Sequence, residues 1–343
     1  MKINVSIFGA SGYTGTQLLS ILINHKNVNI SGVYGDKTSG KRLRDLFPYT
    51  KNIPDIMISS YEDFKASYCD LVFLCLPHQK SEIIIDKIKT LKVIDLSSDF
   101  RIKDEKHYFD WYNSKHPKPD LLSKFVYGLS ELNRSKIKSS NLVANPGCYP
   151  TSILIPLLPL LKENIFSFNE VIIDSKSGLS GAGKSLSTDK LFFEVNENFI
   201  AYSIEKHRHL GEIKQEMQYY NSKINITFVP HLLPISRGIL SSIYLGGNDE
   251  DFKKVKYFFE TYFKNEKFVN FLNNETAASI KSVRGTNNLN FSLHQDYEKK
   301  KIIIISCIDN LIKGAAGQAI QNMNIMFDFN EDESLQLKQL SPL

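Results

Sequence analysis

Short hydrophobic runs alternate with helical patterns through the first half of the chain. The run Leu71–Leu76 has no polar alternation, which is typical of a strand covered on both faces. This pattern predicts parallel strands joined by helices. The expected strands are Ile3–Phe8, Val28–Tyr34, Leu71–Leu76, Val93–Asp95 and Leu142–Ala144, and the expected helices are Thr16–His25 and Lys80–Leu91.

From residue 171 onward the strands become longer and carry more polar positions. This change predicts a second domain built on a largely antiparallel or mixed sheet. Near the C-terminus, Leu311–Phe327 is again helical and contains small residues that allow close packing, so we expect it to return to the first domain. The strands expected in the second domain are Val171–Asp174, Ile224–Val229, Ile239–Tyr244 and Ile302–Ile308, with an amphipathic helix over Asp251–Asn265.

Length and composition indicate a globular protein of two domains. At about 150 residues per domain, a chain of 343 residues suggests two. We place the first domain at residues 1–146 plus 311–343 and the second at residues 147–310. Hydrophobic residues make up 42% of the chain and charged residues 23%, which excludes disordered and fibrous proteins.

Charge and cysteine content exclude several kinds of partner. The chain has 42 basic and 37 acidic residues, and this net charge of +5 is too weak to indicate nucleic acid. The four cysteines form no CxxC pair, so we expect neither a disulfide framework nor a bound metal. No apolar run has the length of a membrane span, and the N-terminus lacks a signal-peptide pattern. We therefore expect a cytoplasmic protein without a membrane partner.

A glycine-rich loop at residues 9–15, GASGYTG, follows the first expected strand and precedes a helix. Glycines at such a turn let the backbone approach a pyrophosphate, whose charge then lies at the helix N-terminus. The loop therefore predicts a dinucleotide site. Asp36 favours NAD, whereas Lys37, Lys41 and Arg42 favour the 2′-phosphate of NADP, so local chemistry leaves the cofactor open.

Cys148 follows an expected strand end and two turn-forming residues in NPGCYPT, residues 145–151. A cysteine at a loop-to-helix junction gains thiolate character from the helix N–H groups. A dinucleotide site together with an activated cysteine suggests a thiolate that captures an acyl group, which then accepts hydride. A buried structural cysteine is the alternative for Cys148, and it is the better interpretation for Cys69, Cys75 and Cys307.

Ten ordered motifs extend along most of the chain. They are GASGYTG (9–15), LPH (76–78), DLSSDFR (95–101), YGLSELNR (127–134), NPGCYPT (145–151), SGLSGAGKS (177–185), KHRHLGEI (206–213), PHLLPISRGIL (230–240), VRGTNNLNF (283–291) and DNLIKGAAGQAIQNMN (309–324). In this order they resemble the N-acetyl-gamma-glutamyl-phosphate reductase family, within the aspartate-semialdehyde-dehydrogenase-like group. The resemblance implies an α/β protein, with a Rossmann-type parallel-sheet domain plus an α+β catalytic and oligomerisation domain of the glyceraldehyde-phosphate/aspartate-semialdehyde dehydrogenase type.

The resemblance also implies a reaction and its residues. Cys148 would attack an acyl phosphate, release phosphate and form a thioester, which hydride from NADPH reduces to the semialdehyde. His207 or His209 would act as acid and base, and the sequence does not decide between them. The implied substrate-binding residues are Arg208, Arg237, Ser180 and Gly181, and the implied cofactor-binding residues are Gly9, Ser11, Gly12, Tyr13, Thr14, Gly15, Lys37, Pro77 and Asn310.

Two positions depart from the family pattern. Asp36 stands where the family usually has a basic or small residue beside the 2′-phosphate, but NADP is still the expected cofactor on family grounds. Ser130 stands where proline is common, which should affect only a loop. The expected partners are the acyl-phosphate substrate and phosphate, in a homo-oligomer that is a dimer or a tetramer. The alternative substrates are aspartyl phosphate and a differently N-blocked compound.

Residues 178–185, GLSGAGKS, also fit the phosphate-loop pattern GxxxxGK[ST]. Such a loop could hold a triphosphate, with Lys184 on the phosphates and Ser185 on magnesium, as in nucleotide hydrolases. A phosphate loop is accompanied by a second strand that ends in a magnesium-binding aspartate. Residues 302–309 are the candidate for that strand, but Asp309 belongs to a family motif. A nucleotide hydrolase is therefore a remote alternative.

Overall fold

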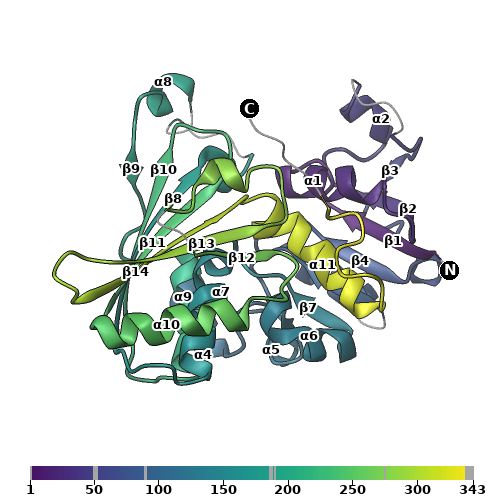
Figure 1. Cartoon of the computed structure of the whole chain (residues 1–343). Coiled ribbons are helices and arrows are strands. Elements are labelled where there is room, and N and C mark those ends of the chain that lie inside the picture. The colour runs from purple at the N-terminus through teal and green to yellow at the C-terminus, as the bar shows by residue number, and fades with distance from the viewer. Residues whose placement is uncertain are drawn as a thin grey trace. The chain divides into compact units, whose positions relative to one another are not determined.

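The computed structural model describes residues 2–48, 53–88, 91–184, 188, 191–273 and 276–336. These residues divide into two compact units, one formed by residues 2–146 and 315–336 and the other by residues 147–314 (Figure 1). Each unit contains a seven-stranded sheet. No helix within the described ranges is long and apolar enough to cross a membrane.

The strands of the first unit are β1 (Ile3–Phe8), β2 (Val28–Tyr34), β3 (Ile58–Ser59), β4 (Leu71–Leu74), β5 (Lys92–Asp95), β6 (Val126–Tyr127) and β7 (Leu142–Ala144). They form a wholly parallel sheet in the order β3-β2-β1-β4-β5-β7-β6, which confirms the predicted parallel arrangement. β3 and β6 were not predicted, because two residues each are too few to show a period. The order reverses between β1 and β4, so the loops after these strands flank the edge where doubly wound sheets bind ligands.

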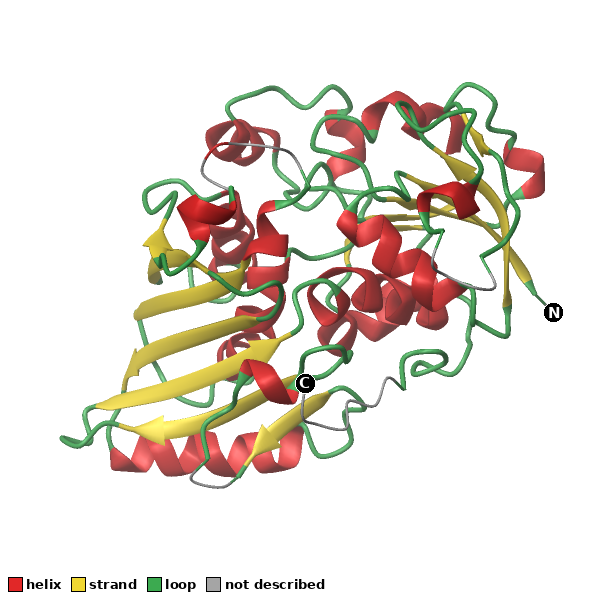
Figure 2. Cartoon of the chain, turned by 90° about the horizontal axis from the view of Figure 1, so that it is seen from above, coloured by secondary structure: helices red, strands yellow, loops and turns green. Residues whose placement is uncertain are grey.

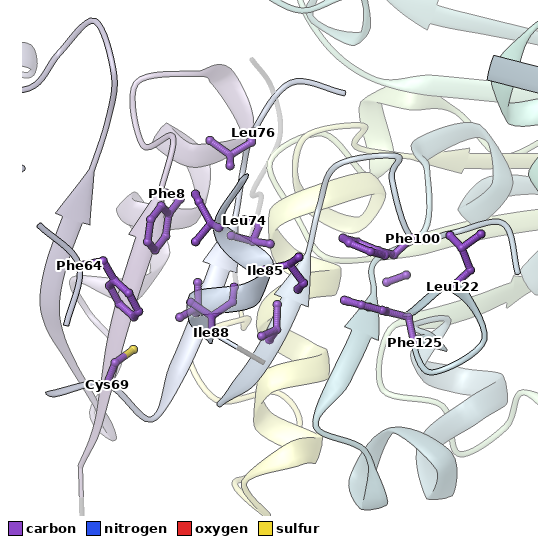
Figure 3. Packing of buried hydrophobic residues seen from close by; sticks show 14 of the residues in the cluster. Phe8, Phe64, Cys69, Leu74, Leu76, Ile85, Ile88, Phe100, Leu122 and Phe125 are labelled. Carbon is purple, nitrogen blue, oxygen red and sulfur yellow. The ribbon is translucent and has the colours of Figure 1, made fainter. Parts of the chain in front are cut away.

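The helices of the first unit are α1 (Tyr13–Leu22), α2 (Leu43–Leu46), α3 (Glu82–Ile88), α4 (Glu105–Tyr112), α5 (Pro119–Leu122), α6 (Ser130–Ser139) and α11 (Gly317–Met326). All four residues of β4 are buried, as expected for a strand covered on both faces. Leu74 of β4 and Ile85 of α3 belong to a core cluster that extends to Phe100 and Phe125 (Figure 3). The rings of Phe100 and Phe125 stack with centroids 4.1 Å apart.

Helix α11 belongs to the first unit, where it packs against α1 and α6. The predicted helix Leu311–Phe327 is confirmed except for its start, where Ile312–Ala316 forms a π-helix. Buried amides need hydrogen-bond partners. Asn322 accepts from the Ser130 hydroxyl at 2.7 Å and donates to the Gly128 carbonyl at 2.8 Å, which ties α11 to the start of α6. The buried amide residues of α11 are Gln318, Gln321, Asn322 and Asn324.

The strands of the second unit are β8 (Glu170–Gly178), β9 (Ile200–Ala201), β10 (Asn225–Leu233), β11 (Ile239–Gly246), β12 (Val269–Leu272), β13 (Leu289–Gln295) and β14 (Lys301–Ile308). Their order in the sheet is β12-β13-β14-β11-β8-β10-β9. β12 pairs parallel with β13 and β8 with β10, while the other neighbours are antiparallel, so the predicted mixed sheet is confirmed. β12 and β13 were not predicted, because Asn270 and Asn290 interrupt their hydrophobic runs.

The helices of the second unit are α7 (Cys148–Lys162), α8 (Phe192–Val195), α9 (Arg208–Gln218) and α10 (Asp249–Tyr262). Figures 1 and 2 show helices gathered along one face of the mixed sheet. α7 contacts β11, β14 and α9. On α10, Phe259 meets Phe291 of β13 edge to face, with centroids 5.0 Å apart.

The sequence predicted that a helix begins at Cys148 but not that it extends to Lys162, because Pro156 and Pro159 lie inside α7. It is buried on almost every side, as a helix that is apolar all round must be. Below it, Ser175, Ser241 and Ser306 form a row across β8, β11 and β14. The Ser241 hydroxyl lies 2.8 Å from the hydroxyl of Ser152 on α7. These small side chains let the helix approach the sheet closely.

We expect Asn322→Leu to lower the free energy of unfolding by about 1–3 kcal/mol, because it removes hydrogen bonds to Ser130 and Gly128 in a buried place. Urea unfolding of the whole chain measures this change. Asn29→Leu in β2 is the matched control. The Asn29 amide donates a hydrogen bond to Asn4 at an exposed position, where water can replace that bond. Equal destabilisation by both substitutions would contradict the role of the α11 amides.

Candidate functional site

The glycine-rich loop connects β1 to α1 at the carboxyl edge of the parallel sheet. Gly9 has a φ of +83°, and a Cβ there would lie 2.4 Å from the Cys75 carbonyl oxygen. A Cβ on Gly15 would lie 2.3 Å from the carbonyl oxygen of Gly9. Gly12 is the N-cap of α1 and supplies no capping side chain. This tight turn before a helix N-terminus suits an approaching pyrophosphate.

The residues that the sequence predicts to discriminate between NAD and NADP follow β2. Asp36 and Lys37 are both exposed there. Arg42 is engaged by Asp55, since its Nη1 lies 2.7 Å from both carboxylate oxygens. Lys37 and Lys41 are therefore the basic residues with which this loop could bind a 2′-phosphate. Pro77 is exposed in the loop after β4, and β4 is the strand next to β1.

A histidine–carboxylate pair follows β4 and β5. His78 Nδ1 lies 2.5 Å from Asp99 Oδ1, and Asp99 has no exposed surface. Burial opposes ionisation of Asp99, but the hydrogen bonds from His78 and from the Gln79 N–H hold the pKa of Asp99 below its usual range. Burial, with the charge of Asp99, raises the pKa of Asp95 to about 7. Both aspartates lie in the DLSSDFR motif, which was the available signal.

Cys148 is the first residue of α7, and Gly147 is the N-cap. This places the thiol at a helix N-terminus, as the sequence predicted, and the residue is partly exposed. Burial raises the pKa of the thiols of Cys69, Cys75 and Cys307, to about 12 for Cys307. A structural role suits these three cysteines, whereas the position of Cys148 suits a nucleophile.

The two candidate histidines lie at the start of α9. His207 is the N-cap, and its Nδ1 accepts the His209 backbone N–H at 3.1 Å. Burial and then the neighbouring Arg208 lower the pKa of His207 to about 4. The ring of Tyr149, the residue after Cys148, lies 5.7 Å from the His207 ring and 5.8 Å from the His209 ring, between centroids. The described residues contain no group of three His, Cys, Asp or Glu side chains that could hold a metal.

Asn310 brings several expected site residues together in the second unit. Its Oδ1 accepts the Gly238 N–H at 2.7 Å, and its Nδ2 donates to the Ser180 hydroxyl at 2.9 Å. Arg237, one residue before Gly238, donates from Nη2 to the buried Asp309 at 2.8 Å. Ser180 and Arg237 are therefore held by adjacent residues after β14. Of the other expected residues, Gly181 follows Ser180, and Arg208 is exposed on α9.

In its described part, residues 178–184, the segment that fits the phosphate-loop pattern does not form a phosphate cradle. The N–H groups of Gly178, Leu179 and Ser180 donate to the carbonyls of residues 238, 235 and 236. Residues 179–182 then form a 3-10 turn, where a phosphate loop would lead into its helix. Ser185 lies outside the described residues. This geometry does not fit a nucleotide hydrolase.

Comparison with known proteins covers nearly the whole chain. Residues 4–140 match the family model described as semialdehyde dehydrogenase, NAD binding domain, and residues 148–310 match semialdehyde dehydrogenase, dimerisation domain. A protein from Campylobacter jejuni named N-acetyl-gamma-glutamyl-phosphate reductase is 44% identical over 339 residues, which cover 98% of each chain. One of the same name from Clostridium beijerinckii is 43% identical over 339 residues, with the same coverage.

Solved structures agree on the fold. Aspartate semialdehyde dehydrogenase II from Vibrio cholerae superposes with a TM-score of 0.74 at 17% identity, covering 96% of this chain and 99% of that one. The enzyme from Candida albicans, solved with NADP, gives a TM-score of 0.68 at 14% identity and covers 95% and 99%. The expected two-part fold is thereby confirmed. The chain belongs to the semialdehyde dehydrogenase family and, within it, to the N-acetyl-gamma-glutamyl-phosphate reductase family.

Proposed function

We propose that the chain is an NADP-dependent reductase of arginine biosynthesis. It converts N-acetyl-gamma-glutamyl phosphate to N-acetylglutamate 5-semialdehyde and phosphate. The observation that carries this proposal is 44% identity, over 98% of the chain, to a reductase of that name. The position of Cys148 at the start of α7, with Tyr149 against both histidines of α9, supports it.

Cys148 is the proposed nucleophile. Its sulfur attacks the acyl carbon, and the bond from that carbon to the phosphate oxygen breaks. Phosphate departs, and the acyl group remains on Cys148 as a thioester. Hydride addition at the thioester carbon produces a thiohemiacetal, whose C–S bond then breaks to release the aldehyde and the thiol. One group must take the thiol proton at the start and deliver a proton to the new oxygen later.

His209 is the proposed acid and base. Its partner His207 has Nδ1 occupied as the cap of α9, and its pKa of about 4 keeps the ring neutral near pH 7. A group that exchanges protons in the neutral range needs a pKa near that range. His207 therefore suits a neutral hydrogen-bonding and positioning role.

The glycine loop supports a dinucleotide cofactor, because the backbone approach at Gly9 and Gly15 leaves no room for side chains. When bound, the nicotinamide supplies the hydride. We propose NADP, with Lys37 beside the 2′-phosphate, since Arg42 is paired with Asp55. The residues proposed to hold the cofactor are Gly9, Ser11, Gly12, Tyr13, Thr14, Gly15, Lys37, Pro77 and Asn310.

Substrate binding is assigned to the second unit. Asp309 orients the Arg237 guanidinium, whose planar fork suits a carboxylate or phosphate. Arg208, Ser180 and Gly181 complete the proposed set. The description of the matching family model as a dimerisation domain supports a homo-oligomer, and we propose a dimer or a tetramer.

The direct test is phosphate-dependent oxidation of N-acetylglutamate semialdehyde, compared with aspartate semialdehyde, using NADP and NAD in turn. We expect kcat/KM to favour the N-acetylated substrate by about 10²-fold or more, because the two substrates differ in polar groups that the site must satisfy. We also expect NADP to be preferred. A preference for aspartate semialdehyde would assign the chain to a related acyl-phosphate reductase, and a preference for NAD would give Asp36 the deciding role.

Cys148→Ser should lower turnover by about 10³-fold or more, because the nucleophile is lost. Its affinity for NADPH, measured by fluorescence titration, should stay unchanged, since the glycine loop is untouched. Cys69→Ser is the control, because serine can keep the hydrogen bond that Cys69 Sγ donates to the Leu71 carbonyl. Residual turnover above about a tenth of wild type would rule out covalent catalysis.

His209→Asn should reduce kcat by about 10²- to 10⁴-fold, because it removes the acid and base. His207→Asn should raise KM more than it lowers kcat, since asparagine still caps a helix. The pH profile of kcat/KM separates the two: with a pKa of about 4, His207 is protonated only below about pH 4. The fall of kcat/KM as the pH is lowered through the neutral range should therefore disappear in His209→Asn alone. Its disappearance in His207→Asn would reverse the assignment.

A further inference from the structure

A buried carboxylate after β5 binds the loop that follows β4, residues 75–81. Asp99 has no exposed surface, and its Oδ1 accepts the Gln79 N–H at 2.9 Å. The same oxygen lies 2.5 Å from His78 Nδ1, which must be the donor because an ionised carboxylate only accepts. Asp99 Oδ2 accepts the Ser81 N–H at 3.3 Å. Both oxygens of one side chain therefore bind this loop.

The loop after β4 lies beside the glycine-rich loop. Strands β1 and β4 pair in parallel, and their last residues, Phe8 and Leu74, are partners in the register. A Cβ on Gly9 would lie 2.4 Å from the Cys75 carbonyl oxygen, so the two loops touch where they begin. The strand order reverses between β1 and β4, and doubly wound sheets bind ligands at such a point. A dinucleotide on the glycine-rich loop would therefore lie against the loop after β4.

The loop after β4 contains a strained turn at Gln79. The φ of Gln79 is +64°, in the left-handed region that residues other than glycine rarely adopt. Such a conformation persists only where the surrounding structure holds it. Here the Gln79 N–H is bound to Asp99, and so are the residues on either side, His78 and Ser81. Asp99 is therefore the group that stabilises this turn.

A second buried carboxyl, four residues before Asp99, reaches the loop through a side-chain hydroxyl. Asp95 accepts the Ser97 hydroxyl at 2.8 Å and the Ser81 hydroxyl at 3.0 Å. Burial and the charge of Asp99 raise the pKa of Asp95 to about 7, so near pH 7 this group is neutral in a large share of molecules. Burial opposes ionisation of Asp99 as well, but its hydrogen bonds hold its pKa below the usual range. Asparagine resembles a neutral carboxyl and can therefore replace Asp95 more readily than Asp99.

We propose that Asp99 is a positioning residue for the cofactor, which fixes the loop after β4 in the shape that binds the dinucleotide. This inference rests on the proposed function, in which Pro77 of this loop helps to hold NADP. Asp99 acts through the backbone of Gln79 and Ser81 and through the ring of His78. If the loop had the binding shape in only about one molecule in ten, the apparent Kd would rise about tenfold.

Asp99→Asn tests this role at constant side-chain size. It replaces one acceptor oxygen with an NH₂ donor, which then faces a donor of the loop. We expect the Kd for NADPH, measured by fluorescence titration, and the KM for NADP to rise about tenfold or more. At saturating NADP, kcat and the KM for the semialdehyde should stay within about threefold of wild type, because Cys148 and the proposed substrate residues belong to the other unit.

Asp95→Asn is the matched control, since it makes the same chemical change in an equally buried carboxyl. Its affinity for NADPH should stay within about threefold of wild type, because the hydrogen bonds from Gln79 and His78 to Asp99 remain. A loss of affinity in Asp95→Asn as large as in Asp99→Asn would show a general effect of disturbing this buried region, and it would overturn the inference.

Gln79→Gly tests whether Asp99 acts through the strained turn. Glycine adopts a positive φ without strain, so the turn should need less support from Asp99. In the Gln79→Gly background, the loss of NADPH affinity caused by Asp99→Asn should therefore be smaller by about threefold or more. An equal loss in both backgrounds would contradict the proposed route.

If Asp99→Asn fails to fold, Gln79→Pro decides at an exposed position. Proline removes the N–H that Asp99 binds and forces a negative φ, so NADPH affinity should fall about tenfold or more. Wild-type NADPH affinity in Asp99→Asn or in Gln79→Pro would overturn the inference. A wild-type chain that binds no NADPH would instead remove the proposed function, so the two failures are distinguishable.

Discussion

The hydrogen bond between Gly147 and Glu212 exemplifies a constraint on which much of this protein depends: a polar group that is buried must find a partner inside. At the start of α7 that partner comes from α9, because the local sequence Gly-Cys-Tyr-Pro offers none. On α11 the same requirement makes Asn322 bond to Ser130 and Gly128. In each case the need for a partner aligns a helix with a specific neighbour.

Helix N-termini carry most of the proposed chemistry. The glycine loop leads into α1, Cys148 opens α7, and His207 caps α9. The positive end of a helix dipole suits both an anionic ligand and a thiolate. The mixed sheet contributes the rigid support: its row of serines admits α7 closely, and Asn310 after β14 connects the loops that hold Ser180 and Gly238.

Prediction from the sequence was strongest where a local pattern and a local cause coincide. Strand β4 was predicted because both of its faces are covered, so its residues form a continuous apolar run. The full length of helix α7 was missed because Pro156 and Pro159 usually end a helix, and burial against the sheet outweighs their cost here. Strands β12 and β13 were missed because Asn270 and Asn290 interrupt their hydrophobic runs, and in the fold these two amides bond to each other across the pair.

Periodicity and ordered motifs were enough to establish the two-part α/β architecture, the dinucleotide loop and the family. The sequence by itself could not choose between His207 and His209, because the two differ only in surroundings: burial and Arg208 lower the pKa of one, which also caps α9. Nor could it reveal that Glu212 supports Gly147, 65 residues earlier in the chain. A pKa and a long-range hydrogen bond depend on which groups lie nearby in space, and only the tertiary structure decides that.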